Sequence, residues 1–209
     1  AAAPLTALAS DALGDDLTNS TVEVNERTEL NAGTFWSNTY SDLRQENYVV
    51  YEPNSSVKPI VSSGSYSTQL STVSAAAHTL EAEGYRVVAG INGDYYDTAN
   101  GIALGSVMSE GVFRNISGSY YALGFYDDGT GVMGKRDLRI NAETESGSTF
   151  GITAMNYVRQ TSFGIFLYDD SFNARGSIGT SEPGLDVICS VDRGELGIGE
   201  ELTLRVENI

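Results

Sequence analysis

Short runs of alternating apolar and polar residues, separated by glycine-containing turns, occupy most of the chain after residue 100. This alternation is typical of β-strands that are joined by hairpins. Glu110-Gly111 and residues 127–130 (Asp-Asp-Gly-Thr) are the clearest turns, because Asp-Gly and related pairs accept the positive φ angles that tight hairpins require. The expected strands span residues 105–109, 112–115, 120–126, 131–134, 137–141, 149–155, 164–168, 185–191 and 201–206.

Two strands and one helix are expected in the first half of the chain. Residues 48–51 and 57–61 are apolar runs on either side of a turn that contains Pro and Asn, and Pro59 favours an edge position. Within residues 68–83, apolar residues recur at spacings of three and four, and Gly84 follows as a C-terminal stop. This segment is therefore predicted to be a helix.

A continuous apolar run, residues 86–91, follows the helix and ends at Asn92-Gly93. Such a run is typical of a buried strand, and Asn-Gly favours a turn because both residues tolerate positive φ. Strands predominate, and they do not alternate regularly with helices. The expected fold class is α+β: a β-rich single domain with a mixed or antiparallel sheet and one main helix packed on that sheet.

The segment after this turn combines carboxylates with tyrosines. Asp94 and Asp97 are three residues apart and enclose Tyr95 and Tyr96. Aromatic rings cover the apolar faces of a sugar, while carboxylates accept hydrogen bonds from its hydroxyls or act on the anomeric carbon. The pattern favours a pocket that binds or cleaves sugars. The alternative is structural, because aspartate side chains also cap turns and helix N-termini.

The order of the blocks around this segment resembles the phosphodiester glycosidase family, which includes the enzyme that removes N-acetylglucosamine from a sugar phosphodiester (the uncovering enzyme). The segments that carry the resemblance are Ala89-Gly-Ile-Asn-Gly-Asp-Tyr-Tyr-Asp97, Gly101-Ile-Ala-Leu-Gly105, Ser109-Glu-Gly-Val112 and Ala122-Leu-Gly-Phe125. The resemblance extends over residues 30–209. It implies an exported bacterial hydrolase that cleaves a sugar-1-phosphodiester on a cell-wall or surface glycopolymer, without a cofactor.

This activity implies specific roles for the residues of the motif. Asp94 is expected to act as the nucleophile or as the base for water, with Asp97 as its alternate or as a ligand to sugar hydroxyls. A phosphate leaving group reduces the need for a general acid, so one carboxylate can suffice. Arg114 is expected to hold the anionic phosphate, the alternative being a surface charge on an edge strand. The other candidate substrate-binding residues are Asn92, Gly93, Tyr95, Tyr96 and Gly105.

The charge and composition of the chain exclude several classes of partner and site. The chain has 209 residues, with 12 Lys and Arg against 28 Asp and Glu, and a formal charge of −16. Such a balance argues against a nucleic-acid partner, and no apolar run reaches the ~20 residues of a membrane span. Cys189 and His78 are single residues of their types, which argues against a zinc site. Cys189 lies in an alternating strand pattern and is expected to be a buried, inert thiol.

Two domain boundaries follow from the sequence. Residues 1–27 lack sustained periodicity and are expected to form a flexible linker or pro-segment, and residues 28–209 are expected to form the glycosidase-like domain. The family carries a later Asp-Gly-Gly-Gly-Ser block that completes the pocket, and this sequence has none. We therefore expect an N-terminal portion with little activity alone, which associates with a C-terminal segment or a second copy.

A second hypothesis comes from a different functional class. The same tyrosines and carboxylates suit a non-catalytic carbohydrate-binding or surface-attachment module. Binding of cell-wall fragments without turnover separates this module from a hydrolase.

Overall fold

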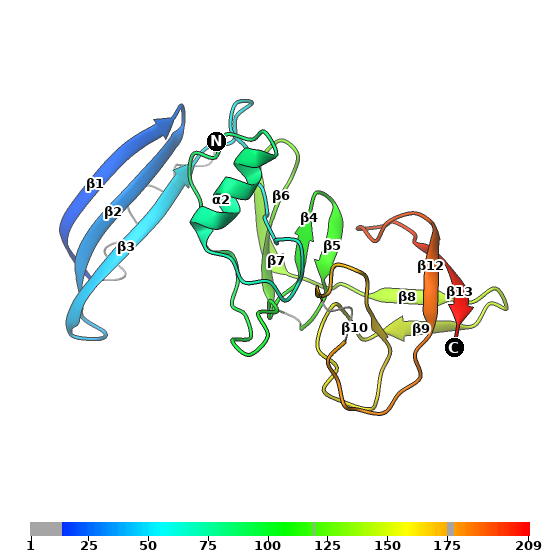
Figure 1. Ribbon diagram of the computed structural model, residues 1–209. Coiled ribbons are helices and arrows are strands. Elements are labelled where there is room, and N and C mark those ends of the chain that lie inside the picture. Colours follow the sequence, from blue (N-terminus) through cyan, green and yellow to red (C-terminus); the bar gives the residue numbers. More distant parts are fainter. Residues whose placement is uncertain (1–13, 119, 175–177) are drawn as a thin grey trace. The chain divides into compact units, whose positions relative to one another are not determined.

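The computed structural model describes residues 14–118, 120–174 and 178–209, and Figure 1 shows its elements coloured along the chain. Within that part the chain has 13 strands and a single helix, so the expected β-rich composition with one helix is confirmed. The strands do not form the large sheet expected from the sequence. They lie in one three-stranded sheet and five two-stranded sheets, all antiparallel except the pair β10-β11.

The described chain separates into two compact units. The first contains the described residues up to Lys58, together with residues 77–92 and 127–130. The second contains residues 59–76, 93–126 and the described residues from Gly131 onward. The single helix that the structure describes is not long and apolar enough to cross a membrane.

The first unit contains the three-stranded sheet. Its strands are β1 (Asp15–Asn25), β2 (Thr28–Ser37) and β3 (Asp42–Tyr51), in the order β1-β2-β3. The expected linker is wrong for residues 15–25, because β1 pairs with β2 along its length, and the hydroxyls of Thr18 and Thr34 lie 2.7 Å apart across the pair. β-branched residues such as these favour a pleated strand. Residues 1–13 of the expected linker lie outside the described residues.

The predicted strand pair around residue 54 forms only in part. Residues 48–51 lie in β3 as predicted, whereas residues 57–61 are irregular. The Asn54 side-chain oxygen accepts hydrogen bonds of 2.8 Å from the N–H groups of two following residues, which closes a turn. Pro59 has no N–H to donate to a strand ladder. The chain therefore leaves β3 without pairing back onto it.

Helix α2 (Val73–Ala82) begins later than the sequence predicts. Its N-cap is Thr72, whose hydroxyl accepts a 3.1 Å hydrogen bond from the Ala75 N–H. The helix is followed by Gly84, whose φ of +98° is the left-handed conformation common at helix C-termini. None of the helix residues is buried, so the expected packing of the helix onto a sheet covers none of its side chains fully.

Residues 86–91 do not form the predicted buried strand. Val87, Val88 and Ala89 are half-buried, and Ile91 is 68% exposed. Among the strands that the structure describes, none pairs with this segment. An apolar run becomes a strand only where a neighbour supplies matching donors and acceptors, and here that neighbour is missing.

The second unit contains the hairpins expected from the alternating pattern. Its strands are β4 (Val107–Ser109), β5 (Val112–Asn115), β6 (Tyr121–Phe125), β7 (Gly131–Lys135), β8 (Ile140–Glu143), β9 (Thr149–Ile152), β10 (Ala154–Met155), β11 (Phe166–Leu167), β12 (Ile188–Arg193) and β13 (Thr203–Asn208). Glu110 and Gly111 join β4 to β5 with φ angles of 52° and 82°, the tight hairpin geometry that the sequence predicts. The predicted strands are thus confirmed here, with ends that differ by a few residues.

The turn between β6 and β7 is also confirmed. The Asp128 carboxylate accepts a 2.9 Å hydrogen bond from the Thr130 N–H and a second one from the Thr130 hydroxyl. These bonds hold the pKa of Asp128 below its ordinary value, because they stabilise the ionised form. The acidic residues of this segment therefore have a turn-forming role.

The core of the second unit lies where β5 and β10 meet. Phe113, Ile116 and Met155 are buried there, and the backbones of Ile116 and Met155 exchange hydrogen bonds of 3.0 and 2.9 Å. The partly buried residues packed against this cluster are Met108, Leu138, Ile140, Leu167 and Leu196. Burial of these side chains fixes β5, and with it Arg114, against the rest of the unit.

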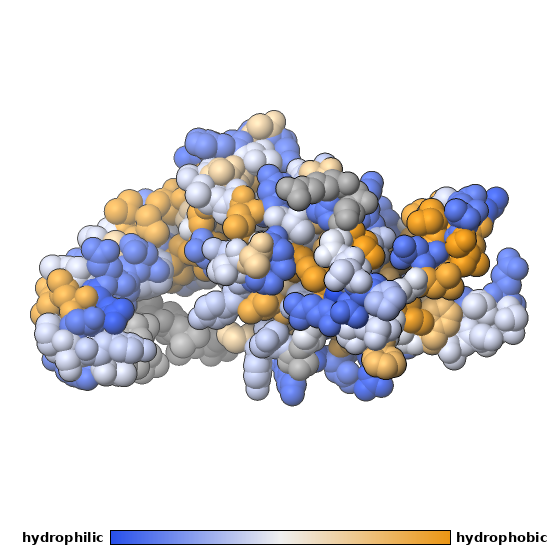
Figure 2. Space-filling view, turned by 60° about the horizontal axis from the view of Figure 1, so that its bottom comes forward, coloured by the Kyte–Doolittle hydropathy of each residue, from blue (hydrophilic) through white to orange (hydrophobic). Residues whose placement is uncertain are grey.

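Apolar side chains remain exposed on the outer hairpins, and Figure 2 shows residues of this kind as orange areas on the face in view. On β6, β7, β12 and β13 they include Tyr121, Leu123, Met133, Ile188, Val191 and Val206. Cys189 in β12 is exposed as well, so the expected buried thiol is wrong. The reason is that β12 and β13 form a two-stranded sheet in which nearly every residue is exposed.

The exposure of Cys189 can be tested with a thiol reagent. In the folded protein we expect about one equivalent of thiol to react with a disulfide reagent as fast as it does in urea, because the Cys189 side chain is accessible. The Cys189→Ser variant is the blank. A thiol that reacts only after unfolding would contradict the exposed position.

Candidate functional site

The Asp94 carboxylate holds together the loop in which the candidate residues lie. One oxygen accepts a 2.7 Å hydrogen bond from the Tyr95 N–H, and the other accepts a 3.0 Å bond from the Gly105 N–H. The Leu104 N–H donates to the Tyr95 carbonyl at 2.9 Å, which closes the loop on itself. Asp94 is exposed, so its remaining lone pairs are open to solvent and to a ligand.

Gly105 is required by the close approach of this carboxylate. A Cβ atom at position 105 would lie 2.5 Å from Oδ2 of Asp94, closer than non-bonded atoms approach. Gly105 is itself buried. The candidate substrate-binding residue Gly105 is thus placed beside the candidate catalytic residue Asp94, and its missing side chain allows their contact.

Asp97 has the contacts of a turn-forming aspartate. Its carboxylate accepts hydrogen bonds from the Ala99 N–H at 2.9 Å and from the Asn100 side-chain amide at 2.7 Å. The Asn100 side-chain oxygen in turn accepts a 3.0 Å bond from the N–H of Ile102, which is fully buried. Asp97 thereby anchors the loop through Ile102.

The two tyrosines of the motif are exposed. Tyr95 is 85% exposed and Tyr96 is 47% exposed, and the backbone of Tyr96 forms an isolated bridge with Ala103. Their rings are therefore accessible while their backbone is held by the loop. Gly93 belongs to the same unit and is exposed, whereas Asn92, also exposed, belongs to the first unit.

Ser117 links the Asp94 loop to the strand that carries Arg114. The Ser117 hydroxyl contacts the carbonyls of Leu104 and Gly105 at 3.0 and 3.2 Å. It also lies 3.3 Å from the side-chain oxygen of Asn115, the last residue of β5. The Asn115 side-chain amide then donates to the carbonyl of Asn156 at 3.2 Å. These side chains are buried, so water does not compete for their hydrogen bonds.

Asn156 is the centre of this network and was not among the residues predicted from the sequence. It is fully buried with a φ of 48°, a left-handed conformation that asparagine tolerates better than most residues. Its side-chain amide nitrogen lies 2.9 Å from the Arg114 carbonyl, 2.9 Å from Oδ1 of Asp169 and 3.3 Å from the Ser171 hydroxyl. Its side-chain oxygen accepts a 3.1 Å bond from the Asp169 N–H.

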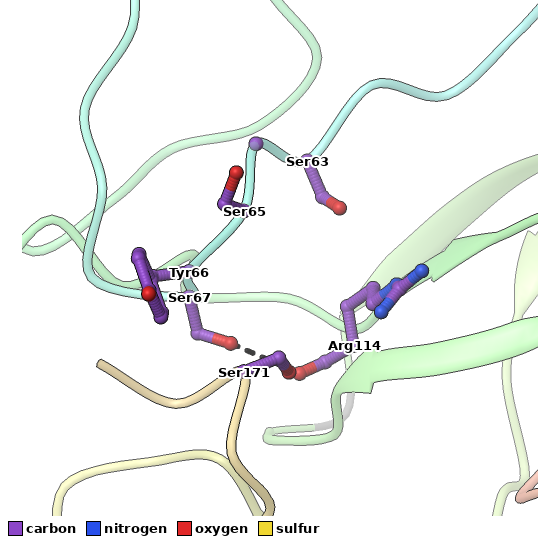
Figure 3. A pocket seen from close by; sticks show the side chains of 7 residues that line it. Ser63, Ser65, Tyr66, Ser67, Arg114 and Ser171 are labelled. Atoms are coloured by element: carbon purple, nitrogen blue, oxygen red, sulfur yellow. Dashed lines mark hydrogen bonds between the residues drawn. The ribbon is translucent and has the colours of Figure 1, made fainter. Parts of the chain in front are cut away.

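Arg114 lines a small polar depression of about 150 Å³ that is open to solvent (Figure 3). The other residues that line it are Ser63, Gly64, Ser65, Tyr66, Ser67 and Ser171. The Ser67 hydroxyl donates to the Arg114 carbonyl at 3.1 Å, and the Ser67 N–H donates to the Ser171 carbonyl at 2.8 Å. The Nε atom of Arg114 is buried without a hydrogen-bond partner among the described residues.

The serines of this depression were missed by the sequence analysis. A signal is present in retrospect: residues 62–67 contain four serines around Gly64, a density of hydroxyls that a plain loop does not need. Gly64 has a φ of +69°, so the chain turns sharply between Ser63 and Ser65.

The structure thus brings most of the predicted residues into one unit. Gly93, Asp94, Tyr95, Tyr96, Asp97, Gly105 and Arg114 all belong to the second unit. Within the described part of the chain, no group of three or more His, Cys, Asp or Glu residues is arranged to hold a metal ion. The arrangement can position a carboxylate beside aromatic rings and can offer a guanidinium and hydroxyls to an anion.

No family model, no curated protein and no solved structure matches the chain. The functional interpretation therefore depends on the side chains and contacts described above.

The contact between Asp94 and Gly105 can be tested by adding one methyl group. Gly105→Ala must displace the Asp94 carboxylate, and we expect the free energy of unfolding in urea to fall by about 1–3 kcal/mol. Gly134→Ala in β7 is the matched control, since a Cβ there meets no atom within 4 Å and should change stability by less than ~0.5 kcal/mol. Equal unfolding midpoints for the two variants would show that the Asp94 contact contributes nothing.

Proposed function

We propose that the chain binds and cleaves a glycosyl phosphodiester, as a phosphodiester glycosidase acting on a cell-wall or surface glycopolymer outside the bacterial cell. The observation that carries the proposal is the pairing of two features in one unit. A backbone-clamped carboxylate, Asp94, lies beside exposed tyrosine rings, and buried hydrogen bonds link its loop to the strand that carries Arg114.

Asp94 is the residue we propose to carry the reaction. Two backbone N–H groups fix its orientation, and a carboxylate has about four lone-pair sites, so capacity remains for a sugar or a water molecule. The phosphate is already a good leaving group, and stabilisation of the oxocarbenium-like transition state therefore dominates over general-acid catalysis. Asp94 acts as the nucleophile or as the base for water. Asp97 orders the loop and is the alternate carboxylate.

The neighbouring residues supply binding. The exposed rings of Tyr95 and Tyr96 are suited to stack on the apolar face of a sugar. Gly93 has open space around it, so a ligand can approach the backbone there. Arg114 is suited to hold the phosphate.

A non-catalytic carbohydrate-binding module is the second candidate function, and one observation favours it. Both oxygens of Asp94 and both oxygens of Asp97 already accept hydrogen bonds from the loop, which is what a purely structural pair would do. Tyr95, at 85% exposure, can stack on a sugar without any chemistry. In that case the tyrosines would carry the binding and no residue would turn over substrate.

The Asp94→Asn substitution separates the two functions. On an N-acetylglucosaminyl-1-phosphodiester, we expect the variant to lose turnover by about 10²–10⁴-fold, because the amide cannot act as nucleophile or base. Release of free sugar is measured, and near-UV circular dichroism verifies that the variant is folded in the assay. This check is needed because Asn cannot accept from both the Tyr95 and the Gly105 N–H and should lower the urea midpoint. Asp137→Asn, an exposed carboxylate outside the loop, is the control.

Two results would contradict the proposed function, each in a different way. Full turnover in Asp94→Asn would remove Asp94 from the mechanism. Saturable binding of cell-wall fragments with no sugar released by the unmodified protein, abolished in Tyr95→Ala, would establish the binding module instead.

A further inference from the structure

We propose that the depression beside Arg114 binds a single tetrahedral oxyanion, the phosphodiester group, through the Arg114 guanidinium and the hydroxyls of Ser63 and Ser65. The identity of the anion as part of the substrate depends on the proposed function above, whereas the anion site itself does not. The new element is the serine segment 63–67 and its pairing with Arg114.

The first support is that the Arg114 guanidinium has no partner. The chain carries 28 carboxylate side chains against 12 Lys and Arg, yet only three of the described arginines form an ion pair with a carboxylate. Arg44, Arg139 and Arg205 do form such ion pairs. Among the described residues, however, no carboxylate lies within ion-pair distance of Arg114, and its Nε is buried without any acceptor. Because Nε is too buried for a ligand to contact, an anion in the depression would be held by the terminal nitrogens of the guanidinium, which have no carboxylate partner.

The second support is that two of the serines that line the depression form hydrogen bonds within its wall, whereas two others do not. Ser67 and Ser171 are engaged in the wall, since the Ser67 hydroxyl donates to the Arg114 carbonyl and the Ser171 hydroxyl donates to Asp169. The hydroxyls of Ser63 and Ser65 have no partner among the described residues and remain available as donors. Figure 3 shows the Ser63 side chain on the side of the segment that faces Arg114.

The wall that presents these hydroxyls is held in place by its own hydrogen bonds. The Gln69 side-chain oxygen accepts a 3.3 Å bond from the Ser65 N–H, and the left-handed φ of Gly64 turns the chain between Ser63 and Ser65. Asn156 fixes the opposite wall through the Arg114 carbonyl and the Ser171 hydroxyl. The site is therefore formed before an anion binds, which lowers the entropy cost of binding.

Charge selects the ligand class. The depression is open to solvent, so the anion binds at its mouth and the sugar stays outside. Asp169, which contacts the lining residue Ser171, already accepts three hydrogen bonds at Oδ1 from Ser171 and Asn156. A guanidinium with hydroxyl donors is the chemistry that recognises phosphate oxygens.

The test is binding of dimethyl phosphate to the full 209-residue chain, followed by calorimetry at low ionic strength. We expect Arg114→Gln to weaken binding by at least about tenfold and Ser63→Ala with Ser65→Ala to weaken it severalfold, with Arg114→Lys in between. Arg193→Gln, an exposed cation on β12, should leave the affinity unchanged. Equal affinity in the Arg114→Gln protein, or an equal loss in the Arg193→Gln protein, would overturn the site.

Two comparisons complete the test. The first identifies which anion the site prefers, and the second separates the anion site from the proposed function. Dimethyl phosphate should bind more tightly than inorganic phosphate or sulfate; the reverse order would mark a free-anion site and overturn its assignment to the substrate. If the chain binds dimethyl phosphate through Arg114 but releases no sugar, the proposed function fails and the anion site stands. If Arg114→Gln retains full turnover, the assignment of the anion to the substrate fails and the proposed function stands. The variant with both serines replaced keeps the test valid if Arg114→Gln does not fold.

Discussion

The hydrogen bonds of one buried amide, that of Asn156, determine how the second unit is held together. Burying an asparagine is costly unless its polar atoms are paired, and here its side chain and backbone contact Arg114, Asn115, Leu167 and the turn at Asp169. Arg114 and Asn115 lie on β5, whereas Leu167 and Asp169 lie at the end of β11 and just after it. The pairing of the Asn156 polar atoms therefore fixes three segments relative to one another, and it requires a left-handed backbone at Asn156.

The candidate site is a consequence of this constraint. The network continues from Asn156 through Asn115 and Ser117 to the carbonyls of Leu104 and Gly105, beside which Asp94 is clamped. Carboxylate loop and arginine strand are thus parts of one hydrogen-bonded structure. The two charged groups differ in their partners. The Asp94 carboxylate accepts hydrogen bonds from two backbone N–H groups of its own loop, whereas the Nε of Arg114 has no acceptor among the described residues, although the chain is acidic. That imbalance points to a ligand which brings negative charge.

Features that depend on contacts between neighbouring residues could be predicted from the sequence, whereas features that depend on contacts between distant residues could not. Hairpins such as that at Glu110-Gly111 were predictable, because turn chemistry and alternation are local. Residues 86–91 were not predictable, because an apolar run does not show whether a partner strand exists. The polar strand β1 was missed because it lacks an apolar pattern, although β2 supplies a partner for it. The Asp94 loop could be identified from its motif. Asn156 could not, since it contacts Arg114 and Asn115, which are more than 40 positions away. The serines around Gly64 give a signal by their density, but this signal does not predict their contact with Arg114.

The most direct test of this account is amide hydrogen exchange in the Asn156→Gly variant. Glycine accepts the φ of 48°, so the substitution removes the side-chain hydrogen bonds without adding backbone strain, and Ser41→Gly, at a φ of 54° in the first unit, is the matched control. The account requires the Gly105 and Ser67 amides to lose protection together by about tenfold or more in Asn156→Gly, with no change in Ser41→Gly. Unchanged protection at Gly105 would contradict it, because the Asp94 loop would then be held independently of Asn156.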